Sequence, residues 1–237
     1  MAAENGRPAL DGIRVLDMTQ VIAGPFCSTM LADMGAELVK IERAHSGDDP
    51  RHMGRYKDRG EEDQDYFFAN NRSRRSISLD LKQKSHQKIA QDLAKQADIF
   101  VENYAPGKVA VLGLGWEELH ALNPRLVYCS ISGFGQTGPN RNRPALDPIV
   151  QAASGLMSVT GVPDGEPMQI GAPVGDAIAG MMAAYAIMSA LRVAERDGSG
   201  HRIDLSMQDA MMAALGPRMG QTLMAHEQPP RVGNANP

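Results

Sequence analysis

The chain has 237 residues, of which 43% are hydrophobic and 22% are charged, a composition typical of a globular protein with a sizeable core. Its 24 basic and 28 acidic residues give a net charge of -4, so no overall basic field would attract nucleic acid or anionic lipid. The two cysteines, Cys27 and Cys129, lie among apolar residues and cannot build a disulfide framework, which favours a reducing compartment.

Short β-rich runs alternate with helical patterns along most of the chain. In chain order the first half predicts a strand over 13–18, a helix over 26–34, a strand over 37–42, a long exposed loop over 44–65, a strand over 76–81, a helix over 85–96 and a strand over 98–102. The second half predicts helices over 108–112 and 116–122, a strand over 126–131, a loop-rich segment over 133–171 with a short helix around 149–156, a helix over 177–196, a strand over 203–206 and a helix over 208–215. This alternation requires right-handed crossovers. We therefore expect an α/β fold, a Rossmann-like parallel sheet flanked by helices.

The helix expected over 177–196 is apolar nearly all round, which predicts that it is buried. Its uncharged run, 177–191, is shorter than the roughly 20 residues that cross a bilayer. Residues 1–10 lack the basic and apolar pattern of a secretory signal. We expect a cytoplasmic protein with no membrane or nucleic-acid partner.

The segment Gly133-Phe134-Gly135-Gln136-Thr137-Gly138 matches the G-x-G-x-x-G pattern of dinucleotide-binding proteins and follows a predicted strand. Two prolines and a polar run come next, so no helix can start there to hold a pyrophosphate. A nicotinamide or flavin site is therefore disfavoured. The 6 histidines are scattered without ligand spacing, so we expect no metal site, and no G-x-S-x-G motif supports a hydrolase.

Asp176 follows the small-residue run 171–175 and stands directly before the long apolar helix. An aspartate in this place is most often a helix N-cap. However, small neighbours leave room for a ligand, and a helix N-terminus favours the ionised carboxylate that a nucleophile requires. The residues alone leave both interpretations open.

The opening of the chain, with LDMT at 16–19, AGP at 23–25 and LADMGAELVKIE at 31–42, resembles that of class III CoA-transferases, the CaiB/BaiF family. Further blocks agree with that family in type and spacing, at 75–82, 98–107, 133–139, 175–176 and 207–210. The blocks follow in register across nearly the whole chain. The resemblance implies the large-domain portion of such an enzyme, which moves CoA from an acyl-CoA to a free carboxylic acid through aspartyl-anhydride and aspartyl-CoA intermediates.

By this resemblance Asp176 is the expected catalytic nucleophile. The residues expected to bind CoA are Arg43 at the nucleotide phosphates, Leu79 and Lys82 beside the adenosine, and Asn103, Tyr104 and Ala105 along the pantetheine. Expected near the acyl group are Gln20, Ile22 and Asp147. Acyl-CoA would be a substrate, and no tightly bound cofactor is implied.

Two departures from the family pattern bear on the substrate. Formyl-transferring members carry glutamine where this chain has Ile22 and tyrosine where it has Leu146, which argues against the formyl and oxalyl pair. Racemases of the superfamily have a histidine base at about Leu146, and leucine cannot move a proton. A racemase-like enzyme and an inactive CoA-binding fragment remain the alternatives to a transferase.

The domain organisation follows from the same resemblance. Residues 1–225 are expected to form the N-terminal portion of the large domain, and 226–237 the start of a linker to a small domain. Full-length members of the family form interlocked homodimers. We therefore expect that this chain alone exposes apolar surface and is incomplete as an enzyme.

Overall fold

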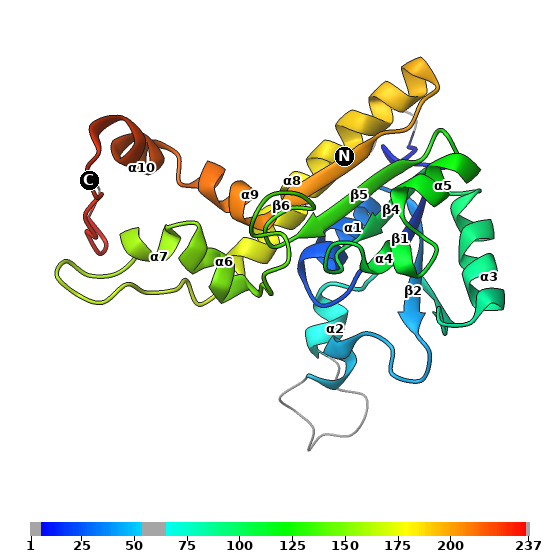
Figure 1. The fold of residues 1–237 in the computed structure, drawn as a ribbon, viewed down its shortest axis with the longest axis horizontal. Helices are drawn as coiled ribbons and strands as arrows, with labels where there is room; N and C mark the ends of the chain where they lie inside the picture. The colour runs from blue at the N-terminus through cyan, green and yellow to red at the C-terminus, as the bar shows by residue number, and fades with distance from the viewer. Residues whose placement is uncertain (1–5, 54–64, 236–237) are drawn as a thin grey trace.

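A single parallel sheet organises the computed structural model, which describes residues 6–53 and 65–235. In this part of the chain six strands lie in the order β3-β2-β1-β4-β5-β6 (Figure 1). Their bounds are β1 (Arg14–Met18), β2 (Glu37–Arg43), β3 (Arg75–Leu79), β4 (Ile99–Glu102), β5 (Val127–Ser132) and β6 (Arg202–Ser206). All neighbouring strands are parallel, so the predicted α/β class is confirmed.

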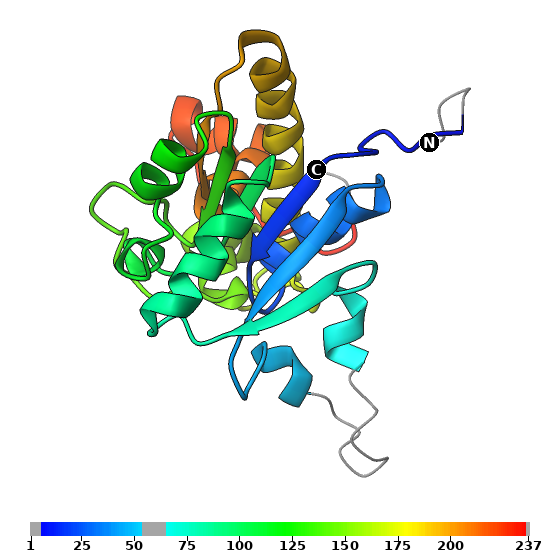
Figure 2. The same ribbon diagram turned by 90° about the vertical axis from the view of Figure 1, so that its right-hand side faces the viewer.

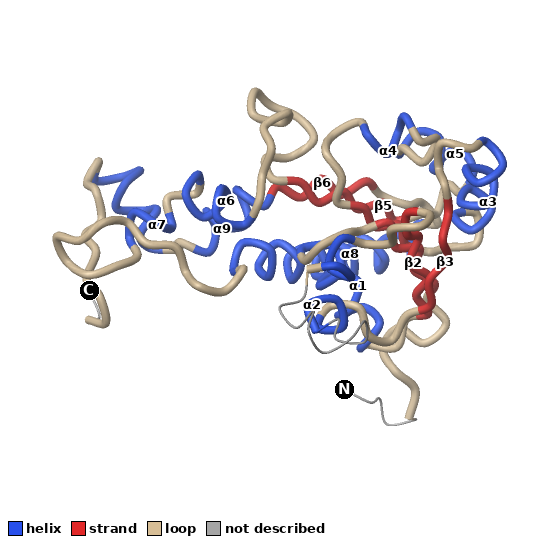
Figure 3. The backbone as a smooth tube through the Cα atoms, turned by 90° about the horizontal axis from the view of Figure 1, so that it is seen from below, coloured by secondary structure: helices blue, strands red, loops and turns tan. Residues whose placement is uncertain are grey.

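Helices connect the strands and cover both faces of the sheet (Figure 2). Their bounds are α1 (Ala23–Asp33), α2 (Asp65–Ala69), α3 (Lys84–Ala94), α4 (Lys108–Val111), α5 (Trp116–Leu122), α6 (Asp147–Ala153), α7 (Leu156–Val159), α8 (Val174–Asp197), α9 (Met207–Ala214) and α10 (Pro217–Gly220). A 3-10 turn, η1 (Asp49–His52), and a π-helical turn, η3 (Gln221–Ala225), complete the set. Figure 3 shows α1 and α8 on one side of the sheet and α3, α4 and α5 on the other.

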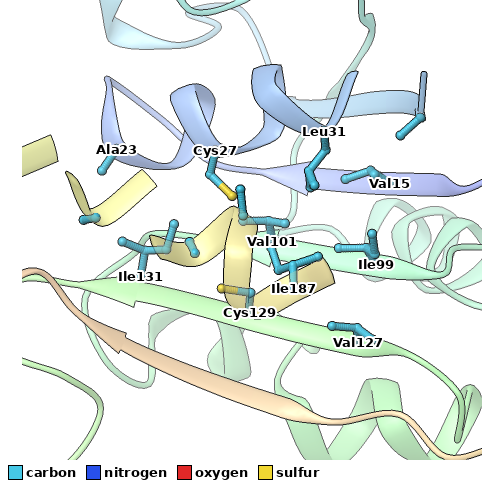
Figure 4. Close-up of a cluster of buried hydrophobic side chains, with 14 of the residues drawn as sticks. Val15, Ala23, Cys27, Leu31, Ile99, Val101, Val127, Cys129, Ile131 and Ile187 are labelled. Carbon is cyan, nitrogen blue, oxygen red and sulfur yellow. The ribbon is translucent and has the colours of Figure 1, made fainter. Parts of the chain in front are cut away.

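The larger core lies between the sheet and the pair α1 and α8. Cys27 and Leu31 of α1 and Ile187 of α8 are fully buried against Ile99 and Val101 of β4 (Figure 4). Such apolar burial is the main favourable term in folding. It explains why β4 and β5 read as almost continuous apolar runs, since helices cover both faces of these central strands.

The second core lies on the opposite face, beneath α3 and α5. Phe100 of β4 stacks on Tyr128 of β5, with the ring centroids 5.0 Å apart. The Tyr128 hydroxyl donates to the carbonyl of Leu114 at 3.2 Å, so its polar end is satisfied. The two cores hold the sheet rigidly between helix layers, which fixes the positions of the strand ends.

Several sequence predictions need correction. The segment 44–65 was expected to be loop, but η1 lies inside it and α2 begins at its end, while 54–64 fall outside the described residues. The one short helix expected around 149–156 is two helices, α6 and α7, separated at Gly155, whose φ is +88°. Helix α1 starts three residues early, at Ala23, because Pro25 fits within a first turn.

Helix α8 is less buried than its sequence predicts. Tyr185 is 76% exposed and Met181 44%, so the prediction of burial all round was wrong. The helix packs one side against α1, α9 and β5, and its other side is open in the described part of the chain. By length and composition α8 alone among the described helices could cross a membrane, a property that core helices of globular proteins share.

The chain beyond α9 folds back on the segment after α7. Arg231 donates to the carbonyls of Ser158 at 3.2 Å and Gly165 at 2.5 Å, and the Gly233 amide donates to Gly161 at 2.9 Å. Helices α6, α7, α9 and α10 thus form an arm that extends away from the sheet (Figure 1). The predicted boundary between 225 and 226 coincides with the end of η3, and the linker beyond it stays a prediction, with 236–237 outside the described residues.

Candidate active site

The strand order places a crevice beyond the carboxyl ends of β1 and β4. The chain runs from β1 outward to β2 and β3, and from β4 outward to β5 and β6, so these two central strands are the switch point where open α/β sheets bind ligands. Gln20 follows β1 and Asn103 follows β4. The Gln20 amide donates to Asn103 Oδ1 and Asn103 Nδ2 donates to the Gln20 carbonyl, both at 2.8 Å. The structure therefore brings together two residues predicted for the site.

A cavity of about 400 Å³ lies beside this crevice, at the ends of β2 and β3. Four of the six residues predicted to bind CoA line it, namely Arg43, Leu79, Lys82 and Tyr104. Asn103 is engaged by Gln20 instead, and Ala105 is exposed next to the cavity wall. His45 and Leu112 also line the cavity and were missed by the sequence reasoning, since neither lies in a recognisable motif.

A second, narrow space of about 10 Å³ continues from the cavity toward Gln20. It shares Arg43 and Tyr104 with the larger cavity and is also lined by Gln20 and Asp48. The shared residues place the narrow space next to the larger cavity.

Arg43 contributes a positive charge to both spaces. It closes β2, pairs with Asp49 and donates from Nε to the Gly47 carbonyl at 3.2 Å. Its side chain is 46% exposed, so the pair with Asp49 lies in water and can exchange for a phosphate at little cost. Lys82 is exposed on the same cavity and adds a second cation.

The wall of the cavity rests on a buried carboxyl group. Glu102 Oε accepts the Tyr104 amide at 2.8 Å and so fixes the backbone that carries the tyrosine ring. Burial raises the pKa of Glu102 to about 7, and its hydrogen bond from Ser130 only partly offsets this. Burial also raises the pKa of the Tyr104 phenol.

Asp176 is the third residue of α8 and does not cap it. Its helix is capped from α6, because Asp147 Oδ1 accepts the amides of Gly175 at 2.6 Å and Asp176 at 3.1 Å. The interpretation of Asp176 as an N-cap is therefore wrong, and its carboxylate is not committed to that task. Burial and then the negative charge of Asp147 raise the pKa of Asp176 to about 7.

The close contact between α8 and α1 shows which way Asp176 faces. A Cβ at Gly180 would lie 2.8 Å from the Ala23 carbonyl oxygen, so only glycine lets the two helices meet there. Asp176 precedes Gly180 by one helical turn and shares its face. Its side chain therefore lies on the side of α8 that packs against α1. The predicted acyl residue Ile22, directly before α1, is buried.

Tyr66 of α2 is a further residue near Asp176. Burial raises its pKa, and the charges of Asp176 and then Asp147 raise it further, which requires that the three side chains lie close enough to interact. The sequence offered no signal for Tyr66, which lies after the predicted loop 44–65 and before the strand predicted over 76–81, where no element was expected.

The chain matches one protein family over almost its whole length. Residues 10–237 match the model of CoA-transferase family III. The chain belongs to this family. It is 42% identical to the succinate–glutarate CoA-transferase of Agrobacterium fabrum over 98% of its own length and 59% of the relative's. It is 40% identical to the succinyl-CoA:glutarate CoA-transferase of Mus musculus over 96% of its length and 52% of that protein.

Solved structures agree with the family assignment. A CAIB/BAIF family protein from Brucella suis superposes with a TM-score of 0.91 at 36% identity, covering 98% of this chain and 61% of that one. The chain spans between half and three fifths of the curated relatives described above.

The remaining predicted acyl residue of this family member, Asp147, is held by α6 and α8. Its Oδ2 accepts Gln151 Nε2 at 2.5 Å, while Oδ1 caps α8. Both carboxylate oxygens thus have protein partners. Asp147 therefore acts as a cap for α8, which the sequence analysis did not predict. Its contact with an acyl group stays a prediction.

In the glycine-rich segment 133–138, a backbone amide that could face a phosphate is bound to a side chain of the protein itself. The Gln136 amide donates to both carboxylate oxygens of Asp204, at 3.0 and 3.1 Å, and the next helix begins only at Asp147. This agrees with the argument against a pyrophosphate site. Within residues 6–53 and 65–235 there is no cluster of three or more histidine, cysteine, aspartate or glutamate side chains with metal-site geometry.

Proposed function

We propose that the chain carries the CoA site and the nucleophile of an enzyme that transfers CoA from an acyl-CoA to a carboxylic acid. The observation that supports this most is the setting of Asp176. It stands in the first turn of α8, whose cap is supplied by Asp147, and it lies on the side of α8 that packs against α1. A pKa of about 7 gives a carboxylate that is more basic than usual and still ionised in part at neutral pH.

The proposed reaction needs only bond exchange at carboxyl carbons. An Asp176 carboxylate oxygen attacks the thioester carbonyl, the C–S bond breaks, and a mixed anhydride and CoA thiolate form. The thiolate then attacks the aspartyl carbonyl and releases the first carboxylate, which leaves aspartyl-CoA. The acceptor acid repeats both steps in reverse order and regenerates Asp176. No net proton or electron is consumed, and the thioester energy is conserved in each covalent step.

The lining of the cavity by Arg43, Leu79, Lys82 and Tyr104 supports a proposed place for the rest of the ligand. In this proposal Arg43 binds the nucleotide phosphates, and Leu79 and Lys82 lie beside the adenosine. The pantetheine follows Asn103, Tyr104 and Ala105 toward Gln20. The acyl group then lies among Gln20, Ile22 and Asp176. This chemistry requires that water, which would hydrolyse the anhydride, is kept out of the site.

The names of the relatives suggest the substrate class. Two relatives act on succinate and glutarate, and another, 43% identical over 96% of this chain and 58% of its own length, is the acetyl-CoA:oxalate CoA-transferase of Acetobacter aceti. All three names contain a dicarboxylic acid. We infer that the acceptor acid is a short dicarboxylate.

The racemase alternative has less support. Leu146 stands where a histidine base would be required, and its side chain is 70% exposed and cannot carry a proton. Exchange of the substrate α-hydrogen in deuterated water would be the result that favours it.

We further infer a homodimer in the cytoplasm. Large apolar side chains are exposed along α8 and in η3, including Tyr185 and Met224, which is 86% exposed. Patches of this kind mark protein contacts. A second copy, or chain segments present in the longer relatives, would cover them.

Covalent trapping tests the proposed function. The protein is incubated with succinyl-CoA and then with hydroxylamine, and peptides are analysed by mass spectrometry. The expected result is a hydroxamate on Asp176, with none in the Asp176→Asn variant. Asp209 is the matched control, because it is also the third residue of a helix but is exposed. Asp209→Asn should leave the adduct on Asp176, and an adduct on any other residue would refute the assignment.

A further inference from the structure

The loop between β1 and α1 carries an unusual backbone conformation. Val21 has φ of +67°, in the left-handed region that β-branched residues avoid. It stands between Gln20 and Ile22, the two residues assigned to the acyl group, and directly before α1. A conformation of this kind is unfavourable and persists only where the surroundings enforce it.

The side chain of Asp48, 27 residues further along the chain, holds Val21 in this conformation. The Val21 amide donates to Asp48 Oδ1 at 3.1 Å, and Asp48 Oδ2 accepts from Lys40 Nζ at 2.7 Å. The side chains of Lys40 and Asp48 are each 1% exposed. Lys40 Nζ also donates to Asn71 Oδ1 at 2.9 Å, and the Asp48 amide donates to Glu42 Oε2 at 3.0 Å. Asp48 therefore has little freedom to move.

The Asp48 contact complements the hold on Gln20. Asn103 binds both backbone groups of Gln20, whereas Asp48 binds the next residue from the opposite side of the crevice. Asp48 also lines the narrow space that leads from Tyr104 to Gln20. A buried ion pair such as Lys40–Asp48 contributes little to stability, so a role in positioning the loop after β1 explains better why the pair is there.

We propose that Asp48 is a positioning residue, which holds Val21 in its left-handed conformation and thereby places Gln20, Ile22 and the start of α1 against Asp176. The proposal rests on the proposed CoA transfer for its kinetic part. It requires that Val21, once released, turns to negative φ and draws its two neighbours away from the acyl group. CoA itself, held at Arg43 and Tyr104, would bind as before.

The test removes the acceptor without leaving a buried charge. Lys40→Met with Asp48→Leu replaces the pair by apolar side chains of similar size, an exchange that folded proteins commonly tolerate. Misplacement of reacting groups by 1 Å can cost about 100-fold in rate. The expected result is a fall of about 100-fold in kcat with KM for succinyl-CoA within about twofold of the starting value. A crystal structure of the variant should show Val21 at negative φ.

Rescue separates positioning from general damage. Val21→Gly added to the double variant should restore about tenfold or more of the lost kcat, because glycine adopts positive φ without strain. Ser73→Gly is the matched control, since Ser73 is exposed and also has positive φ, +59°, but lies outside the site. It should restore nothing. Equal rescue by both glycines would overturn the proposal.

The test also covers a double variant that does not fold and a protein that shows no CoA transfer. If the double variant does not fold, Asp48→Asn takes its place, with and without Val21→Gly, and the same pattern of loss and rescue is required. If the unsubstituted protein shows no CoA transfer even when it is assembled with the segments that its longer relatives contain, the proposed function fails, and the crystal structure of the variant still decides the positioning claim. Val21 at φ near +67° without Asp48 would refute it.

Discussion

Asp147 Oδ1 accepts the backbone amide of Asp176 at 3.1 Å, so a residue of α6 begins the helix that carries the proposed nucleophile. The same carboxylate raises the pKa of the Asp176 side chain, because two negative charges close together oppose ionisation. Asp147 thus stabilises the helix of Asp176 and destabilises its charge. The first predictions concern this pair.

Asp176→Asn is expected to stabilise the fold at neutral and alkaline pH. The pKa of Asp176 rises from 3.8 to about 7 on folding, so its neutral form favours the folded state below pH 3.8 and that contribution is lost as the pH rises through 7. The variant does not ionise and should exceed the unsubstituted chain by about 1–2 kcal/mol in unfolding free energy at pH 8, with little difference at pH 4. Urea unfolding at both pH values measures this. Lower stability of the variant at pH 8 would contradict the pKa assignment, and Asp209→Asn provides the control.

CoA transfer is expected to increase with pH until Asp176 is ionised. The rate should rise about tenfold per pH unit below the pKa of Asp176, about 7, and level off above it. Asp147→Asn keeps an oxygen that can accept the two amides but removes the charge, so the midpoint of the profile should move to lower pH. Initial rates from pH 5.5 to 8.5 provide the measurement. A midpoint that is the same in both proteins would show that Asp147 does not act on the titrating group.

Arg43→Ala is expected to weaken CoA binding more than it changes the choice of acyl group. Hydrogen bonds to charged groups contribute about 1.5–3 kcal/mol, which corresponds to a loss of about ten- to 100-fold in affinity. Calorimetric titration with CoA and with dephospho-CoA measures the loss and identifies the phosphate involved. Arg75→Ala is the matched control, because Arg75 is also exposed but is the first residue of β3, at the amino ends of the strands, away from the cavity. Equal affinity of Arg43→Ala and the unsubstituted chain would exclude this phosphate contact.

The open face of α8 is expected to drive association. Burial of apolar surface contributes roughly 25 cal/mol per Å², so a charge placed on this face should oppose assembly. Tyr185→Lys should reduce the sedimentation coefficient of the purified protein at a given concentration. Val111→Lys, at a residue that is 81% exposed on α4, is the control and should have no effect. Identical sedimentation of the Tyr185 variant and the unsubstituted chain would argue against an interface there.

The sequence by itself determined the fold class, and its resemblance to the CoA-transferase family supplied the nucleophile candidate. Alternating periodicity of two and 3.6 residues specifies strands and helices locally, and parallel strands joined by helices leave few topologies. The resemblance to the CoA-transferase family grouped Arg43, Leu79, Lys82 and Tyr104. They line one cavity because each ends or closely follows a strand whose carboxyl end lies at the same edge of the sheet.

Only the tertiary structure decided how these groups are held. The amides of Gly175 and Asp176 find their cap at Asp147, 28 and 29 residues earlier, and Gln20 pairs with Asn103 across 83 residues. No local pattern encodes such partners, because a backbone amide bonds equally well to any carboxylate that packing brings near. For the same reason the exposed side of α8 could not be foreseen. The apolar sequence of a helix predicts that its surface is buried, but the arrangement of the other elements decides which side of the helix they cover.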